Sequence, residues 1–589
     1  METTASYEKK PWLNRYEDGV PHEISFEKAL LPDFLERSAK RFPDKRALKF
    51  EGYHVTYKEL NSMVERFSGH LYSFGIRKGD AVAILLPSLI SCVICYYAII
   101  KIGGIAVMNN PLYSDRELEH QFNDSGAKVL ITLDCLPNDN LVNRMIDLRP
   151  RTNIKQIIYA TGGDFLPPVK KILFRLFGKK KKLSVSVKEA EDIYSFNKLM
   201  KKKAPQAPKI SLSPDDVAMY QYTGGTTGVS KGVMLTHGNL SNHTQQLKSW
   251  LPQFKEGKEV MLGALPSFHV FGLTVCMNFS ILMGWENVVV PKPNAGNLIR
   301  AITSHRPTFV PMVPTMYINI LKHPDIERAD MTSIRACFSG GSPMPVEVIK
   351  NFEAKTGAVI IEGYGLTESS PIVSVNPFSG VRKAGSIGVP FPNTQCRIVD
   401  IEDGKTDVLP GECGELIVKG PQVMKGYLNR LEETEKVLKN GWLHTGDVAR
   451  MDEDGYFYIV DRIKELIISG GYNVYPRDIE EVIYTHPDIL EAAVIGIPHP
   501  SRGEAAKVFA VLKEGRTMTQ KDLIDYCSER LAKYKLPTRV EFRENLPKSA
   551  VGKILKRVLK EEEIKKSSVN SIRNAEPPEK QSACYLRCA

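Results

Sequence analysis

Two long stretches without a charged residue, 81–100 and 260–285, constrain the fold of this chain most. Length alone would allow either one to span a membrane as a helix. Pro87 divides the first into a strand-like part and a helix-like part ending at Gly103 and Gly104, because the residue before proline avoids the helical conformation and glycine commonly ends a helix. The second is interrupted at Pro266, Ser267, His269, Gly272 and Asn278. We therefore expect both stretches to lie in a buried α/β core.

Short apolar runs typical of buried strands alternate with helical periodicity along much of the chain. The strand-like runs lie at 129–132, 259–262, 288–290 and 359–361, and residues 30–42 have apolar side chains at helical intervals. This alternation predicts an α/β multidomain protein whose large N-terminal domain contains α/β layered subdomains. After about residue 376, strands punctuated by glycine and proline predict a β-rich subdomain.

We expect three parts: a large domain at 1–461, a small α+β domain at 462–562 and a disordered tail at 563–589. The small domain has predicted helices near 476–484 and 519–531, and residues 461–464 form a plausible hinge. The tail is mixed and polar, a composition that cannot bury enough apolar surface to fold.

Composition excludes several classes of protein. Of 589 residues, 42% are hydrophobic and 25% charged, which is an ordinary globular balance. The net charge of +11 is modest for this length and does not indicate a nucleic-acid binder. Only Cys92 and Cys95 among ten cysteines have CxxC spacing, so buried thiols in a reducing compartment are favoured over zinc. The N-terminus lacks the apolar stretch of a signal peptide, so we expect a cytoplasmic protein.

Residues 165–183 combine seven basic residues with apolar ones. An amphipathic basic helix can bury its apolar face at a lipid surface while its lysines meet anionic headgroups. An exposed loop with solvated lysines is the alternative. The first interpretation predicts a weak peripheral contact with an anionic membrane, on its inner face.

The strongest local signal is the segment 222–232, YTGGTTGVSKG. Three glycines within five positions let backbone amides turn toward an anion, neighbouring threonines add hydroxyl donors, and Lys231 adds a positive charge. Ser230 takes the place of the glycine that precedes the lysine of a P-loop, so the spacing is not that of the usual P-loop. The composition suits a polyphosphate, although a flexible turn would be an alternative for the segment taken alone.

Seven further segments accompany this loop, at 266–272, 339–343, 362–368, 414–427, 442–447, 460–471 and 547–553. In this order they resemble the adenylate-forming superfamily, which includes acyl-CoA synthetases, luciferases and peptide-synthetase adenylation domains. The resemblance spans about residues 30–560. A hydrolase interpretation fails, because residues 340–344 lack the final glycine of a nucleophile elbow.

The resemblance implies a two-step reaction. The carboxylate of an acid attacks the α-phosphate of ATP to give acyl-AMP and pyrophosphate, and the thiol of CoA then takes the acyl group and releases AMP. Since the first two reactants are both anionic, cations and aligned donors must offset their repulsion. Glu368 would ligate Mg²⁺, which needs few protein ligands. We therefore expect Mg²⁺ as cofactor, with ATP and CoA as co-substrates.

Site residues follow from the same resemblance. Residues 223–228 and Lys231 would hold the β- and γ-phosphates, Tyr364 would stack on the base, and Asp447 would accept hydrogen bonds from the ribose. The complete set expected for ATP and AMP is Thr223, Gly224, Gly225, Thr226, Thr227, Gly228, Lys231, Gly340, Gly341, Ser342, Glu362, Gly363, Tyr364, Gly365, Thr367, Asp447, Arg462 and Lys553.

Lys553 is the predicted catalytic lysine, acting with Glu368, Thr367 and Lys231. By resemblance it reaches the carboxylate and the α-phosphate from the small, mobile C-terminal domain. That domain would then rotate about Lys464 and withdraw Lys553. Ser469, Gly470 and Gly471 would line the path of the CoA pantetheine.

His269 matches the family position near the substrate carboxylate, and Leu273 and Val313 could line an acyl tunnel or simply pack in the core. Residues 266–272 lack the acid that adenylation domains pair with an amino group, which argues against amino-acid activation. Leu273 also departs from the tryptophan gate of some long-chain members.

The resemblance is closest to bacterial long-chain fatty-acid–CoA ligases, so a fatty acid is the expected substrate, with no nucleic-acid partner. Medium-chain and aryl acids stay open, as does a fatty-acyl-AMP ligase that loads a carrier protein. The latter class has an insertion that is not obvious between Tyr458 and Tyr475. A non-catalytic binder would not need Lys231, Glu368, Asp447 and Lys553 together.

Overall fold

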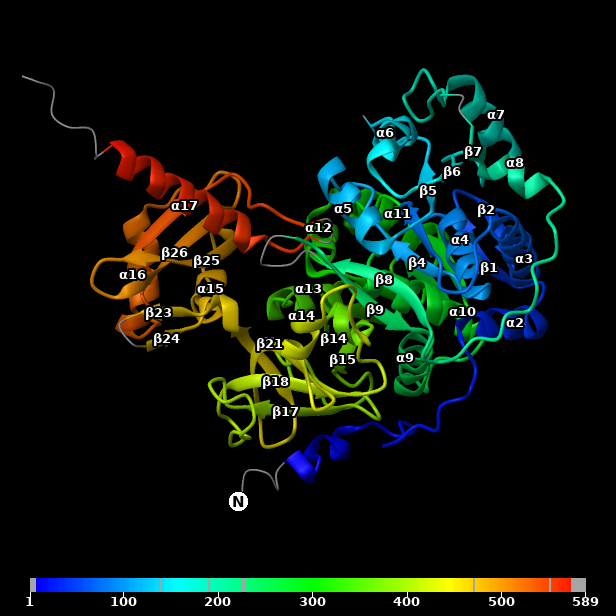
Figure 1. Ribbon diagram of the computed structural model, residues 1–589. Coiled ribbons are helices and arrows are strands. Elements are labelled where there is room, and N and C mark those ends of the chain that lie inside the picture. The colour runs from blue at the N-terminus through cyan, green and yellow to red at the C-terminus, as the bar shows by residue number, and fades with distance from the viewer. Residues whose placement is uncertain are drawn as a thin grey trace, which may run out of the picture. The chain divides into compact units, whose positions relative to one another are not determined.

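A computed structural model describes residues 7–137, 139–188, 191–223, 229–469, 472–549 and 552–573 (Figure 1). The chain divides into two compact units, Met1–Ile459 and Val460–Ala589. Each unit mixes helices with sheets, in agreement with the predicted α/β multidomain class.

A nine-stranded sheet forms one layer of the first unit. In spatial order its strands are β16 (Val389–Pro390), β15 (Ile372–Val375), β14 (Val359–Gly365), β13 (Ala336–Ser339), β12 (Phe309–Met312), β10 (Val260–Gly263), β11 (Glu286–Val289), β1 (Arg46–Phe50) and β2 (Tyr53–Thr56). The strands from β14 to β1 pair in parallel, and the pairs at both ends are antiparallel. Parallel strands place their carboxyl ends on one edge, where ligands bind in open α/β sheets.

An eight-stranded sheet forms a second layer of this unit. Its strands are β19 (Gly426–Tyr427), β9 (Lys231–Thr236), β8 (Val217–Thr223), β4 (Ile105–Met108), β3 (Ala81–Leu85), β5 (Val129–Leu133), β6 (Gln156–Ala160) and β7 (Ile193–Ser195). β8 and β9 form an antiparallel hairpin, and β19 adds to its free edge from far along the chain.

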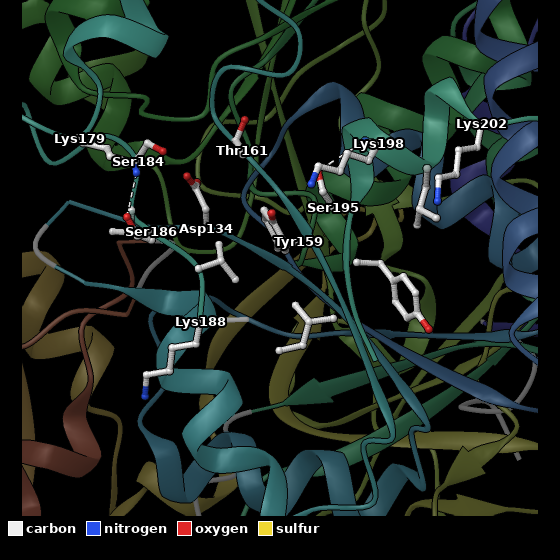
Figure 2. Close-up of a pocket in the computed structure, with 15 residues that line it drawn as sticks. Asp134, Tyr159, Thr161, Lys179, Ser184, Ser186, Lys188, Ser195, Lys198 and Lys202 are labelled. Carbon is white, nitrogen blue, oxygen red and sulfur yellow. Dashed lines mark hydrogen bonds between the residues drawn. The ribbon is translucent and has the colours of Figure 1, made fainter. Parts of the chain in front are cut away.

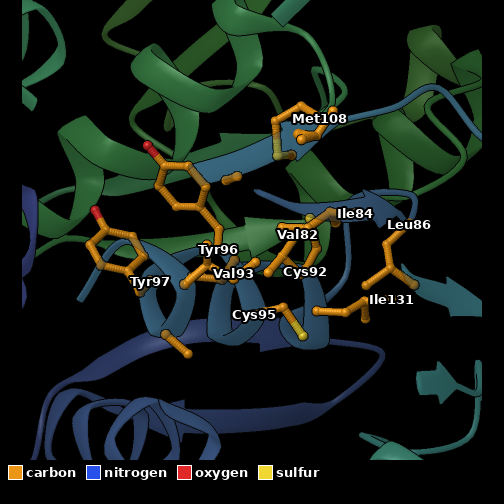
Figure 3. Close-up of a cluster of buried hydrophobic side chains, with 14 of the residues drawn as sticks. Val82, Ile84, Leu86, Cys92, Val93, Cys95, Tyr96, Tyr97, Met108 and Ile131 are labelled. Atoms are coloured by element: carbon orange, nitrogen blue, oxygen red, sulfur yellow. The ribbon is translucent and has the colours of Figure 1, made fainter. Parts of the chain in front are cut away.

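Helix α4 (Ile90–Lys101) contacts β3 and β4 of one sheet and β1 of the other. Figure 3 shows Cys92 and Val93 of α4 beside Val82 and Ile84 of β3. All of its residues from Ile90 to Ile100 are buried, both cysteines included. The predicted strand, break and buried helix of residues 81–100 are therefore confirmed.

The second apolar stretch is also broken as predicted. It begins with β10, continues through a π-helix at Gly272–Asn278 (η3) and ends in α10 (Phe279–Met283). Within the described residues, no helix is both long and apolar enough to cross a membrane.

A five-stranded sheet follows the two large sheets, where a β-rich subdomain was predicted. It contains β17 (Gln395–Val399), β18 (Gly414–Lys419), β21 (Trp442–Met451) and β20 (Leu438–Lys439), which form antiparallel pairs in this order, with β22 (Phe457–Arg462) paired to β21.

The second unit has its own five-stranded sheet, β24 (Tyr472–Val474), β23 (Ile467–Ser469), β26 (Gly503–Leu512), β25 (Ile489–His499) and β27 (Arg539–Phe542). Helices α15 (Pro476–Tyr484) and α17 (Lys556–Arg573) contact β25, and α16 (Gln520–Ser528) contacts β27. The predicted disordered tail is wrong for residues 563–573, which continue α17. The Glu563 carboxylate lies 2.8 Å from the buried Lys507 ammonium and ties the helix to the sheet. Residues 574–589 lie outside the described residues.

The basic segment contains α7 (Pro168–Phe177), beyond the β7 edge of the eight-stranded sheet (Figure 1). The expected helix is present, and none of its residues is buried. Phe174 packs on Gly163, where an added Cβ would meet its ring at 2.4 Å. Its other large apolar side chains are exposed, at Val169, Ile172, Leu173, Leu176 and Phe177.

Candidate functional site

The β8–β9 hairpin fixes both ends of the predicted phosphate loop. Thr223, the last residue of β8, pairs with Lys231, the first residue of β9. At the far end, the Gln121 amide donates a hydrogen bond of 3.2 Å to the Ser230 hydroxyl. Gly224, Gly225, Thr226, Thr227 and Gly228, which the sequence predicts to bind phosphate, lie outside the described residues. The loop thus starts and ends on anchored backbone.

Lys231 has two neighbours that the sequence did not predict. Its ammonium forms an ion pair with Glu433 of α14 (Leu431–Val437) and lies 5.2 Å from the centre of the Tyr427 ring. Strand β19 brings Tyr427 there, because Tyr427 pairs with Val233 of β9.

The same tyrosine reaches the predicted magnesium ligand. The Tyr427 hydroxyl donates a 2.7 Å hydrogen bond to the Glu368 carboxylate, in the short 3-10 helix Thr367–Ser369 (η5). Burial, followed by the negative charge of Glu368, raises the pKa of Tyr427. Tyr427 therefore contacts both Lys231, which is predicted to bind the β- and γ-phosphates, and Glu368, which is predicted to bind Mg²⁺.

Glu368 is chemically suited to bind Mg²⁺ in a nucleotide site. Across the described residues there is no group of three or more His, Cys, Asp or Glu side chains able to hold a metal. Mg²⁺ in nucleotide sites is commonly held by one or two carboxylates, with substrate phosphates and water completing its octahedron. A half-buried carboxylate oriented by one hydroxyl donor meets that requirement.

Two glycines allow the backbones of β14 and β15 to approach closely where the adenosine is expected to bind. β14 carries Glu362, Gly363, Tyr364 and Gly365 at its carboxyl end, and β15 pairs against it there. A Cβ on Gly363 would lie 2.6 Å from a Val375 methyl, and one on Gly365 would lie 1.8 Å from the Pro371 carbonyl oxygen. Larger residues would push the two strands apart.

Tyr364 and Asp447 meet within the first unit. The Tyr364 hydroxyl donates a hydrogen bond to the Asp447 carboxylate, and Asp447 is 5% exposed. The two residues assigned to the base and the ribose thus occupy one place, although they are far apart in sequence.

A buried pair near Asp447, Glu415 with His444, was not predicted from the sequence. His444 Nδ1 lies 2.7 Å from the Glu415 carboxylate, whose other oxygen accepts a 3.0 Å hydrogen bond from the Gly446 amide. The Thr445 hydroxyl accepts a 3.1 Å bond from the Asp447 amide. These contacts hold the turn that presents Asp447. Glu415 and His444 both lie in segments that carry the family resemblance, which was the available signal.

Gly340, Gly341 and Ser342 follow β13, and Ser339 pairs with Glu362 of β14. Gly341 has a φ of +89°, a conformation that favours glycine, and its Cβ position lies 3.6 Å from Val313. The structure therefore brings Val313, assigned to the acyl group, beside the loop assigned to the base.

His269 is half-buried just before the π-helix, and its Nδ1 accepts a 3.2 Å hydrogen bond from the Phe271 amide. Leu273, inside the π-helix, is wholly buried and belongs to the same core cluster as α4. π-Helices are rare and are often found at functional sites. This one lies where the acyl group was expected.

The second unit carries the other predicted residues. The Lys553 carbonyl accepts a 2.8 Å hydrogen bond from the Ser549 amide. Arg462 ends β22, Lys464 lies in the 3-10 helix Ile463–Glu465 (η6), and Ser469 ends β23. Gly470 and Gly471 lie outside the described residues.

None of these residues lines the polar cavity of about 630 Å³ drawn in Figure 2. It is lined by Asp134 and by residues that follow α7, including Lys179, Ser184 and Lys188. The Lys179 ammonium donates a 2.8 Å hydrogen bond to the Ser186 hydroxyl, drawn as a dashed line in Figure 2.

Comparison with known families decides the affiliation. The AMP-binding enzyme family matches residues 35–428, and the AMP-binding enzyme C-terminal domain matches residues 478–553. The chain belongs to the AMP-binding enzyme family. The predicted adenylate-forming resemblance is thereby confirmed.

Two bacterial long-chain-fatty-acid–CoA ligases are similar to this chain over most of its length. The chain is 44% identical over 557 residues to a long-chain-fatty-acid–CoA ligase of Bacillus subtilis (strain 168), covering 94% of this chain and 98% of that protein. It is 39% identical over 559 residues to a ligase of the same name from Escherichia coli O157:H7, with the same coverage. A crystal structure of the anthranilate CoA ligase AuaEII in complex with anthranoyl-AMP has a TM-score of 0.81 at 25% identity, covering 92% of this chain and 98% of that one. This similarity agrees with the predicted fold class.

Proposed function

We propose that this protein is an AMP-forming long-chain fatty-acid–CoA ligase. The observation that carries the proposal is its 44% identity to the Bacillus subtilis ligase across nearly the whole of both chains. The site supports it, because within the first unit Tyr364 contacts Asp447, and Tyr427 contacts both Lys231 and Glu368.

In the first step, Lys231 and the amides of the phosphate loop hold the β- and γ-phosphates. Tyr364 stacks on the adenine, and Asp447 accepts hydrogen bonds from the ribose. Glu368, together with the phosphates, would hold Mg²⁺, which would supply positive charge against the anionic phosphates. His269 lies near the substrate carboxylate, and Val313 faces the acyl group.

Lys553 supplies the mobile charge of this step. A flexible ammonium suits a group that enters and then leaves a site. After adenylation the second unit turns about Lys464, and Ser469, Gly470 and Gly471 then line the path of the CoA thiol. Residues 1–461 and 462–562 act as the two functional domains.

Substrate choice between fatty and aromatic acids needs its own test, because the chain is also 34% identical to a feruloyl-CoA synthase of Amycolatopsis sp.. Purified protein with ATP, Mg²⁺ and CoA should release AMP most efficiently with long-chain acids, in a series from acetate to oleate that includes ferulate. A maximum at medium-chain or aromatic acids would reassign the substrate. Acyl-AMP formation without CoA-dependent AMP release would indicate an acyl-AMP ligase.

Lys553→Ala tests the first step. We expect fatty-acid-dependent exchange of pyrophosphate into ATP to fall by at least about 100-fold, since a lost electrostatic contact to the reacting groups commonly costs that much. Lys548→Ala removes a nearby lysine that pairs with Glu491 and should leave exchange within about two-fold. Near wild-type exchange in Lys553→Ala would refute the role of Lys553.

We also propose that α7 binds the surface of an anionic membrane, as part of a cytoplasmic enzyme that meets its substrate at the inner face. Leu176 is 68% exposed and Val169 is 70% exposed. Lysines at 179–182 follow the helix directly. An exposed apolar face beside basic residues suits an anionic lipid surface, and one such helix would bind weakly and reversibly.

A further inference from the structure

The ammonium of Lys231 already has a carboxylate partner in this structure. Its partner, Glu433, lies outside every segment that the sequence analysis assigned to the nucleotide. The Lys231 side chain is 21% exposed and that of Glu433 is 35% exposed, so the pair borders solvent. A phosphate that approaches Lys231 must therefore compete with the Glu433 carboxylate for the same ammonium.

The backbone of Glu433 is fixed because its helix, α14, is anchored on β19. The Thr434 hydroxyl accepts a 2.9 Å hydrogen bond from the Tyr427 amide and donates a 2.8 Å bond to the Arg430 carbonyl. A Cβ on Gly426 would lie 2.8 Å from Thr434, so α14 packs closely on β19. Since β19 pairs with β9, the strand that begins at Lys231, the backbone positions of Glu433 and Lys231 are fixed relative to each other.

The Glu433 carboxylate is charged at neutral pH. The hydrogen bond from Lys231 is the main cause that lowers the pKa of Glu433, and the charges of Lys231 and Arg430 act in the same direction. The Glu433 carboxylate therefore balances the positive charge of Lys231 before any polyphosphate arrives. A carboxylate that stayed against Lys231 would repel bound phosphates, whereas a half-exposed side chain can swing into solvent at little cost.

We propose that Glu433 is the exchangeable counter-ion of Lys231. Resting on the function proposed above, this assigns Glu433 as a positioning residue for the pyrophosphate half of the reaction. Before ATP binds, Glu433 holds the Lys231 ammonium at the start of β9, and it then releases the ammonium to the β- and γ-phosphates of ATP. It takes the ammonium back as pyrophosphate leaves, so polyphosphate binds less tightly and departs faster.

The test is the Glu433→Gln variant, which keeps the shape and removes the charge. Binding of pyrophosphate and of ATP with Mg²⁺ should tighten about three- to ten-fold by calorimetry, the range expected for one half-exposed charge. Pyrophosphate should become a stronger product inhibitor by a similar factor. The thermal midpoint should change by less than about 2 °C, since the lost pair is a surface one.

Glu432→Gln is the matched control, because Glu432 is the exposed neighbour on the same helix and should leave both affinities unchanged. Unchanged or weaker polyphosphate binding in Glu433→Gln would overturn the proposal. So would equal tightening in Glu432→Gln, which would indicate a general effect of net charge. Calorimetry needs no acid or CoA, so a protein that forms no acyl-CoA would refute the proposed function without deciding the role of Glu433.

Discussion

Helices α4 and α7 are both rich in large apolar side chains, yet the structure treats them in opposite ways. Every residue of α4 from Ile90 to Ile100 is buried, whereas α7 has no buried residue. α4 contacts strands of two sheets, while α7 lies beyond the last strand of one sheet. Apolar content alone therefore does not identify a core helix, because the number of layers around the helix decides its burial.

The surroundings of the two helices also differ in polarity. α4 packs against the apolar strand β3, shown in Figure 3. Residues that follow α7 line a polar cavity together with Asp134, an acid that is 1% exposed. Apolar packing around α4 stabilises the fold, whereas the region next to α7 contains a buried acid, Asp134, that lowers the stability of the fold.

Ile94→Ala should give the largest effect. Ile94 is wholly buried in α4, so the substitution should lower the free energy of unfolding by about 2–5 kcal/mol, through lost burial and the cavity it leaves. Urea denaturation followed by tryptophan fluorescence measures this, since Trp12, Trp250, Trp285 and Trp442 all lie in the first unit. The paired variant Ile172→Ala in α7 should change it by less than about 0.5 kcal/mol. Equal losses would contradict the comparison.

Asp134→Asn should give the next largest effect. Burial raises the pKa of Asp134 from 3.8 to about 6, so the folded protein holds this proton more tightly than the unfolded chain does. Stability from this group is present below pH 4 and is lost as the pH rises through 6. The shift corresponds to about 3 kcal/mol. Asparagine can still accept the 2.9 Å hydrogen bond from the Cys135 amide.

The measurement compares both proteins at low and high pH. The variant should be more stable than the wild type at pH 8, and the difference should shrink toward pH 4. A constant difference across this range would mean that the Asp134 carboxylate does not titrate in the folded protein as its burial implies.

Leu176→Asp should have the smallest effect on stability, within about 0.5 kcal/mol, because the side chain is 68% exposed. Binding to vesicles of anionic phospholipid should nevertheless fall by about ten-fold, as an apolar contact becomes a charge facing anionic headgroups. Activity should fall more with liposome-bound fatty acid than with detergent-dispersed fatty acid. Leu409→Asp, at an exposed leucine outside α7, is the control and should bind vesicles like the wild type. Equal losses with both forms of substrate would reject the membrane proposal.

Much of the fold could be read from local patterns. Pro87 separates β3 from α4 as predicted, and the helix expected near 476–484 is α15. These elements follow from periodicity and breakers over a few neighbouring residues. Residues 563–573 were misjudged, because their helix is held by the contact of Glu563 with Lys507, a residue distant in sequence.

The site likewise contains residues that the sequence predicted and residues that it did not. Tyr364, Asp447 and Glu368 were predicted from family segments, and the structure brings Tyr364 and Asp447 together. The roles of Tyr427 and Glu433 could not be predicted, because they depend on the pairing of β19 with β9. A contact across about two hundred residues leaves no periodic signal in the sequence.

The two-residue strand β19 also bears on how the protein is made. The edge of β9 stays without its partner until residues 426–427 have left the ribosome, so a nascent chain exposes an unpaired strand edge while most of the first unit is already synthesised. Such edges recruit other chains. Fragments that stop short of Gly426 should therefore aggregate during expression, whereas fragments that end after β22 should stay dispersed.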